Sequence, residues 1–67
     1  MTPDEVEDYR RMLEARQWLR LGYNTAASIE GLRKRIEHQR GGAAAERLIN
    51  EMRQQYAIRD QWMGSQS

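Results

Sequence analysis

The chain has 67 residues, no cysteine and a formal net charge of +1, with 39% hydrophobic and 31% charged residues. This length allows at most one domain, and a domain so small buries only about 60% of its unfolded surface. Without cysteine, disulfides and thiolate metal sites are excluded as sources of stability, which leaves helix packing or oligomerisation. We therefore expect a thin core and a homodimer.

The charge is unevenly distributed along the chain. Residues 1–8 hold four acids and no base, residues 9–40 hold eight bases against three acids, and residues 41–67 are balanced. The basic middle segment favours a partner with an acidic surface. No stretch approaches the roughly 20 apolar residues of a membrane span, and the acidic start has no signal-peptide core. We expect a cytoplasmic protein with no membrane partner.

The first predicted helix covers residues 3–21. Thr2 can cap it, with Pro3 in the first turn and Glu5 completing a Thr-x-x-Glu capping box. Gly22 suits its end, because glycine adopts a positive φ without steric cost. Apolar residues at helical spacing form its expected core stripe: Val6, Tyr9, Met12, Leu13 and Leu19.

A second helix is predicted over residues 25–40. Asn24 or Thr25 can cap its start, and the double glycine Gly41-Gly42 ends it. So short a link predicts that the second and third helices form an antiparallel hairpin. The expected core stripe of the second helix is Ile29, Leu32 and Ile36.

The third helix is predicted over residues 43–62, opening in three alanines, the best helix formers. Its expected stripe is Ala45, Leu48, Ile49, Met52, Tyr56 and Met63. Residues 64–67 are expected to fray. The sequence thus predicts an all-α, compact three-helix protein whose single domain covers residues 1–63. The thin core favours a dimer.

No pattern that carries catalysis is present. His38 is the only histidine, and Glu37 beside it does not complete the ligand set of a metal site. Ser28 and Ser65 lack the base and the Gly-rich elbow of an activated nucleophile, and no phosphate-cradling loop occurs. We therefore expect no enzyme activity, no metal and no cofactor.

The second helix carries a basic run, Arg33-Lys34-Arg35, with Arg40 further on. Consecutive helical residues flank a face rather than share it, so one interpretation is a solvated surface. The other is an anchor for phosphate or for an acidic protein surface.

A helix-turn-helix motif is a weak match to the same region. Ala27 and Gly31 have its alanine–glycine spacing, but Glu30 and Glu37 fall where it requires buried apolar residues. A small nucleic-acid-binding regulator that uses the basic face of the second helix is therefore the alternative, not the leading, function.

Trp18 lies close to Arg20 and Leu21 near the end of the first helix. A tryptophan beside an arginine has the composition of a protein interface hot spot. Trp62 gives a second instance near the C-terminus. The competing interpretation is that both indoles close the edges of a small core. The predicted partner-binding residues are Trp18, Arg20, Leu21, Arg33, Arg35 and Arg40.

Three stretches between Ala15 and Tyr56 carry a family resemblance: Ala-Arg-x-Trp-Leu, Ile-x-x-Leu-x-x-x-Ile-Glu-x-x-Arg-Gly and Ala-Ala-x-x-Leu-x-x-x-Met. The chain resembles small helical proteins of unknown function encoded by bacteriophages and prophages, although Tyr23-Asn24-Thr25 stands where these usually have a proline-containing link. The resemblance implies a mobile-element accessory protein in the cytoplasm of a bacterial host.

The resemblance also shapes the expected function. It implies a non-enzymatic, protein-binding effector that inhibits or redirects a bacterial host protein, as anti-defence and host-takeover proteins do. A virion assembly factor is a third possibility. Because that group has no assigned active site, it supplies no functional residues.

Overall fold

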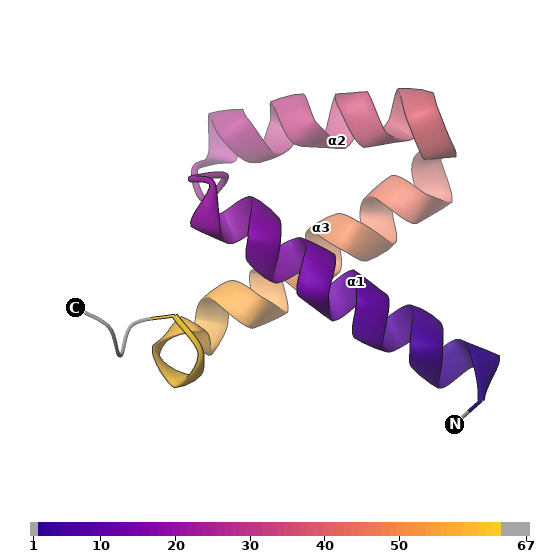
Figure 1. Cartoon of the computed structure of the whole chain (residues 1–67). Coiled ribbons are helices and arrows are strands. Elements are labelled where there is room, and N and C mark those ends of the chain that lie inside the picture. The colour runs from indigo at the N-terminus through magenta and orange to yellow at the C-terminus, as the bar shows by residue number, and fades with distance from the viewer. Residues whose placement is uncertain (1, 64–67) are drawn as a thin grey trace.

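The computed structural model describes residues 2–63, which form three α-helices and a final 3₁₀ turn (Figure 1). These are α1 (Pro3–Arg20), α2 (Ala26–Arg40), α3 (Gly42–Ala57) and η1 (Arg59–Gln61). The described range holds no strand, and the predicted all-α class is confirmed. The fraying expected of residues 64–67 lies outside this range. None of the helices is both long and apolar enough to cross a membrane.

Local side-chain chemistry sets the starts of the first two helices. The Thr2 hydroxyl accepts from the backbone N–H of Glu5 at 3.2 Å, and the Thr2 N–H donates to the Glu5 carboxylate at 3.2 Å. Thr25 and Ser28 form the same reciprocal pair before α2, at 3.2 and 3.0 Å. Each pair satisfies helix N–H groups that have no partner within the helix. The predicted capping box of α1 is confirmed, and Thr25 is the cap of α2.

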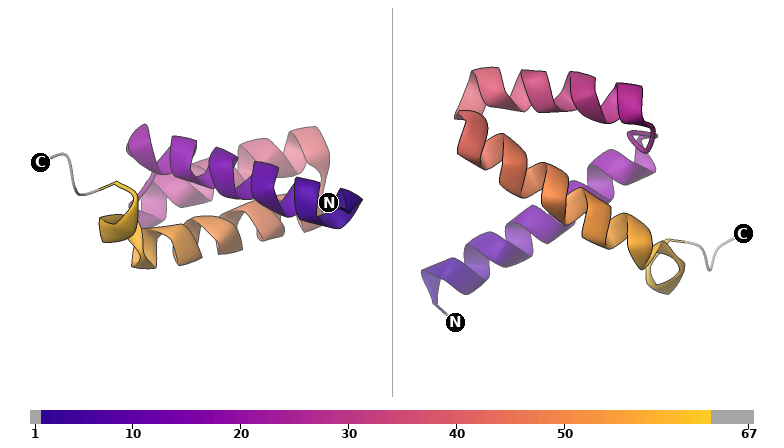
Figure 2. Two further views of the ribbon diagram at one scale, coloured as in Figure 1. Left: turned by 60° about the horizontal axis from the view of Figure 1, so that its bottom comes forward. Right: turned by 180° about the vertical axis from the view of Figure 1, so that it is seen from behind.

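The junction between α2 and α3 is a single glycine. Gly41 has φ +94°, a conformation that side chains disfavour, and it ends one helix and begins the next. The prediction that these helices pack on each other is confirmed. They diverge from the junction as a V, so that the middle of α3 crosses α1 (Figures 1 and 2). The central helix α3 thereby packs against both of the others.

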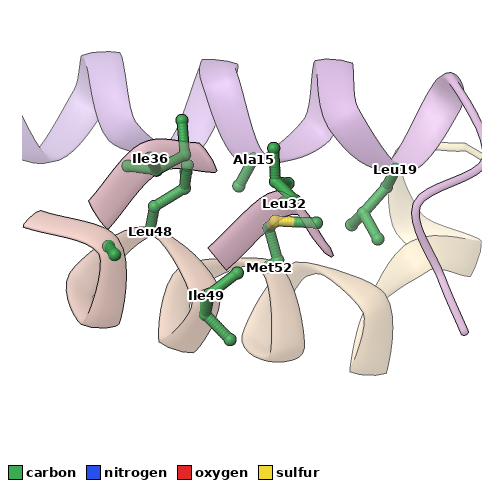
Figure 3. Packing of buried hydrophobic residues seen from close by; sticks show 8 residues of the cluster. Ala15, Leu19, Leu32, Ile36, Leu48, Ile49 and Met52 are labelled. Carbon is green, nitrogen blue, oxygen red and sulfur yellow. The ribbon is translucent and has the colours of Figure 1, made fainter. Parts of the chain in front are cut away.

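The core fills the space where the three helices meet (Figure 3). Its largest fully buried side chains come from α2 and α3, and α1 contributes only Ala15 and Leu19. The core is therefore small, as the composition predicts. Its buried hydrophobic residues are Ala15, Leu19, Leu32, Ile36, Ala45, Leu48, Ile49 and Met52.

The predicted core stripe of α1 is wrong in its first half. Tyr9 is 55% and Leu13 45% exposed, whereas Ala15 is fully buried. At about 100° per residue, Leu13 points roughly 160° away from Ala15. Ala15 and Leu19 face the core, which leaves Tyr9 and Leu13 on the outer side of the helix.

The predicted end of the third helix is also wrong, since α3 stops at Ala57. The indole N–H of Trp62 donates to the carbonyl of Gln55 at 2.9 Å, and Arg59 donates to the carbonyl of Tyr56 at 2.9 Å. Both contacts use helix-end carbonyls that lack partners within the helix. Tyr56 is 38% exposed, and Gln55, at 6%, is buried instead.

Candidate functional site

Trp18 lies at the edge of the core. Its ring meets that of Tyr23 edge to face, with centroids 5.0 Å apart, and its indole N–H donates to Glu14 at 3.2 Å. The side chain is half-buried against the core cluster. These contacts match the interpretation in which the indole closes a small core, and they leave only part of its surface for a partner.

The second tryptophan, Trp62, lies against the end of α1. The guanidinium groups of Arg16 and Arg20 lie 5.1 and 5.4 Å from the ring centroid of Trp62, a cation–π arrangement. Arg16 also donates to the buried side chain of Gln55 at 2.8 Å. Leu21, just beyond, is 60% exposed. Arg20 is exposed as well.

Arg33 and Arg35 flank the buried face of α2 on opposite sides. The Nε atom of Arg33 is buried without a hydrogen bond, 3.6 Å from the carboxylate of Glu30. Arg35 is exposed and borders a shallow hollow on the other flank. The remaining residues that line this hollow are Tyr23, Ser28, Gly31 and Leu32.

Arg40 forms a bidentate ion pair with Glu14, with nitrogen–oxygen distances of 2.9 and 2.7 Å. This pair connects the end of α2 to the middle of α1. The hydrogen bond from Arg40 lowers the pKa of Glu14, against a smaller raising effect of burial, and the bond from Trp18 lowers it further. Glu14 thus brings two of the predicted site residues, Trp18 and Arg40, onto one carboxylate.

A cavity of about 300 Å³ opens beside this ion pair, between α1, the start of α3 and the end of α2. We call it the arginine cavity, because four of its eight lining residues are arginine. Arg11 is paired with Asp8 at 2.9 Å, whereas Arg10 and Arg47 form no ion pair with any residue between 2 and 63. The lining residues are Glu7, Arg10, Arg11, Glu14, Arg40, Ala44, Arg47 and Leu48.

This arrangement suits recognition of an oxyanion. Arginine offers a planar set of N–H donors that matches a carboxylate or a phosphate in two parallel hydrogen bonds. Arg40 is held in place by Glu14, and no acidic side chain between residues 2 and 63 pairs with Arg10 or Arg47. Within the described part of the chain, no group of three or more acidic, histidine or cysteine side chains is placed to hold a metal ion.

The sequence interpretation missed Arg10 and Arg47. They lie on different helices, and only the crossing of α1 over α3 brings them to one cavity. The only sequence signal for them was that both are arginine. Ten of the eleven basic residues are arginine, so this signal does not single them out.

A second feature is the outer side of α1. Tyr9 and Leu13 are exposed there, and Val6 lies about 20° from Leu13 around the helix. We call Val6, Tyr9 and Leu13 the outer stripe. The side chains of Glu7, Arg11 and Glu14, which line the arginine cavity, point to a different side of α1.

Comparison with known proteins identifies the family of the chain but not its function. No curated protein and no solved structure matches it. One family model matches residues 4–59, which is most of the chain and nearly all of the three helices. On this match the chain belongs to DUF7696, a family of unknown function.

Proposed function

We propose that this protein is a non-enzymatic effector that binds another protein through the arginine cavity. The observation that carries the proposal is the pair Arg10 and Arg47, which form no ion pair within residues 2–63 and face one cavity beside Arg40, held by Glu14. An acidic side chain of a partner would be held there by charge-assisted hydrogen bonds.

The cavity wall favours a protein ligand over a nucleic-acid backbone. Ala44 and Leu48 add apolar surface to it, which suits a carboxylate on a peptide that also carries apolar groups. Glu7 and Glu14 lie in the same wall and would repel a run of phosphates. A single carboxylate can approach the arginines while avoiding both acids.

The kind of partner is proposed from the resemblance. The stretch from Ala15 to Tyr56 is similar to phage-encoded proteins, and a bacterial host protein with an acidic surface is the partner that this similarity supports. Binding would inhibit or redirect that protein in the host cytoplasm by forming a stoichiometric complex, without catalysis. We also propose that the effector acts as a homodimer.

A tagged pull-down from a bacterial lysate, treated with nuclease, tests the proposal. We expect the wild-type protein to retain its partner and the double variant Arg10→Glu, Arg47→Glu to lose it. Arg53→Glu is the matched control, because Arg53 is an exposed arginine of α3 outside the cavity. Equal retention by the double variant and the control would show that the cavity is not the binding site.

Nucleic-acid binding by α2 is the second candidate, since Lys34 and Arg35 are exposed and form no ion pair within residues 2–63. Duplex DNA binding weakens by about 0.9 log units per log unit of salt for each phosphate contacted. A partner that is lost on nuclease treatment, with such a salt dependence and with sensitivity to Arg35→Glu, would support this candidate instead.

A further inference from the structure

The outer stripe of α1 is an apolar surface that the fold leaves uncovered. Tyr9 and Leu13 are one helical turn apart and are 55% and 45% exposed, although the chain has few large apolar residues. Figure 1 shows α1 in front of α3, with its N-terminal half extending past the crossing. Leu13 points roughly 160° away from the buried Ala15, so its side of α1 faces away from the core.

We propose that a second copy of this chain covers the outer stripe, with the two α1 helices packed antiparallel about a two-fold axis. The stripe is flanked by charges that continue its line along the helix. Glu5 lies one turn before Tyr9, and Arg16 and Arg20 follow Leu13 at helical spacing. At one-turn spacing from Glu5, the order along the helix is an acid, the aromatic Tyr9, the aliphatic Leu13 and then two bases.

In an antiparallel pair of α1 helices, the acidic end of each copy lies opposite the basic end of the other. When two α1 helices run antiparallel, Tyr9 of each copy lies against Leu13 of the other. Glu5 of each copy then comes within reach of the exposed Arg20 of the other, whereas Arg16 is held by Gln55 and Trp62 of its own copy. A two-fold axis makes every such contact twice, as an isologous dimer requires.

A parallel pairing would be unfavourable for the same reason. The first two turns of α1 hold Asp4, Glu5, Glu7 and Asp8, and the rest of the helix holds four arginines against one glutamate. Parallel copies would place these like charges side by side, and antiparallel copies place opposite charges together. The antiparallel arrangement also opposes the two helix dipoles favourably.

This surface deepens the homodimer part of the proposed function, and it can fail separately from partner binding by the arginine cavity. Glu7, Arg11 and Glu14, which line the cavity, point away from the outer stripe, whereas Arg10 lies about 40° from Val6 around the helix and borders both. A monomer could still bind a partner through Arg10 and Arg47, and the stripe variants Leu13→Glu and Tyr9→Glu leave every residue of the cavity unchanged.

Sedimentation equilibrium of the full chain over a range of concentrations tests the dimer. We expect a species of twice the 7.9 kDa chain mass for the wild type. Leu13→Glu and Tyr9→Glu should raise the dissociation constant at least tenfold, and circular dichroism should show that both keep their helicity, since both positions are exposed. Leu21→Glu is the matched control, because Leu21 is 60% exposed but lies off the stripe. The control should dimerise as the wild type does.

A charge test examines the antiparallel orientation. Glu5→Gln keeps the capping box, in which glutamine can replace glutamate, but removes the charge beside the stripe. It should weaken the dimer severalfold at low salt, whereas Glu7→Gln, two residues along the chain and on the cavity side of α1, should not. A wild-type monomer at all concentrations would overturn the proposal. A dimer that tolerates both Leu13→Glu and Tyr9→Glu, or one that responds equally to the two glutamine variants, would overturn it as well.

Discussion

At the scale of single residues, Glu14 connects α1 directly to the end of α2. Its carboxylate accepts two hydrogen bonds from Arg40 and one from Trp18, and so ties α1 to the end of α2. Bidentate pairing of this kind is stronger than a single exposed ion pair, though solvent still screens it. The ion pair therefore stabilises the fold and also fixes one wall of the arginine cavity.

We predict that Glu14→Gln lowers the free energy of unfolding by about 0.5–1 kcal/mol at neutral pH. The Arg40 bond lowers the pKa of Glu14 in the folded state, so its contribution is present above the ordinary value of 4.5 and is lost as the pH falls through the lower, folded-state pKa. Urea unfolding of both proteins at neutral pH and in acid measures this. A difference that stays constant into strong acid would contradict the assignment.

Core residues should respond very differently from exposed ones. Leu48 and Ile36 are 2% and 1% exposed where α2 meets α3, so Leu48→Asp or Ile36→Asp buries an unpaired charge. The cost, several kcal/mol, is comparable to the whole stability of a domain of this size. We expect circular dichroism to show loss of helicity and of the cooperative melt. Leu21→Asp, at an exposed leucine, should melt as the wild type does, and a folded Leu48→Asp protein would show that the core assignment is wrong.

At the scale of helices, features that depend on contacts close in sequence could be predicted, and features that depend on contacts between helices could not. The starts of α1 and α2 depend on contacts three residues apart, such as Thr2 with Glu5, and these are legible in the sequence. The buried face of α1 depends on which side α3 crosses. Tyr9 and Leu13 lie on one side and Leu19 on another, and the deciding residue, Ala15, is too small to mark a core position by hydropathy.

The end of α3 was not predictable for a related reason. Apolar spacing continues through Tyr56 to Met63, which favours a longer helix. The helix instead ends where Trp62 and Arg59 fold back onto its last carbonyls. Gln55 is buried because Arg16 and Glu51 supply its hydrogen bonds, a compensation that requires both α1 and α3 to be in place.

A glycine inside α2 gives a prediction at this scale. A Cβ atom at Gly31 would meet nothing within 4 Å, so no close helix contact requires the glycine there. Gly31→Ala should raise the free energy of unfolding by about 0.5–1 kcal/mol through helix propensity. Gly41→Ala should lower it, since φ is +94° at that position. Denaturant titration of the two variants checks both signs, and a destabilised Gly31→Ala protein would indicate an unrecognised contact on that side of α2.

At the scale of the whole molecule, the arginine cavity shows why function was harder to predict than fold. Arg10 and Arg47 become neighbours only through the crossing of α1 and α3, which the small core determines. The sequence interpretation instead emphasised Arg33 and Arg35, which are close in sequence but lie on opposite flanks of α2. Proximity along a helix does not place side chains on one surface.

The proposed dimer predicts that the stability of the whole molecule depends on concentration. If the folded chain is a two-fold dimer through Tyr9 and Leu13, folding is coupled to association, and the melting temperature rises with protein concentration. For a domain of this size the rise should be a few degrees for each tenfold increase. Leu13→Glu should melt at a temperature that changes less with concentration, because its dimer is at least tenfold weaker. Calorimetry across a wide concentration range makes the comparison, with Leu21→Glu behaving as the wild type. A wild-type melting temperature independent of concentration, in the range where sedimentation detects a dimer, would mean that association adds nothing to the stability of the folded chain and that the outer stripe is not buried in it.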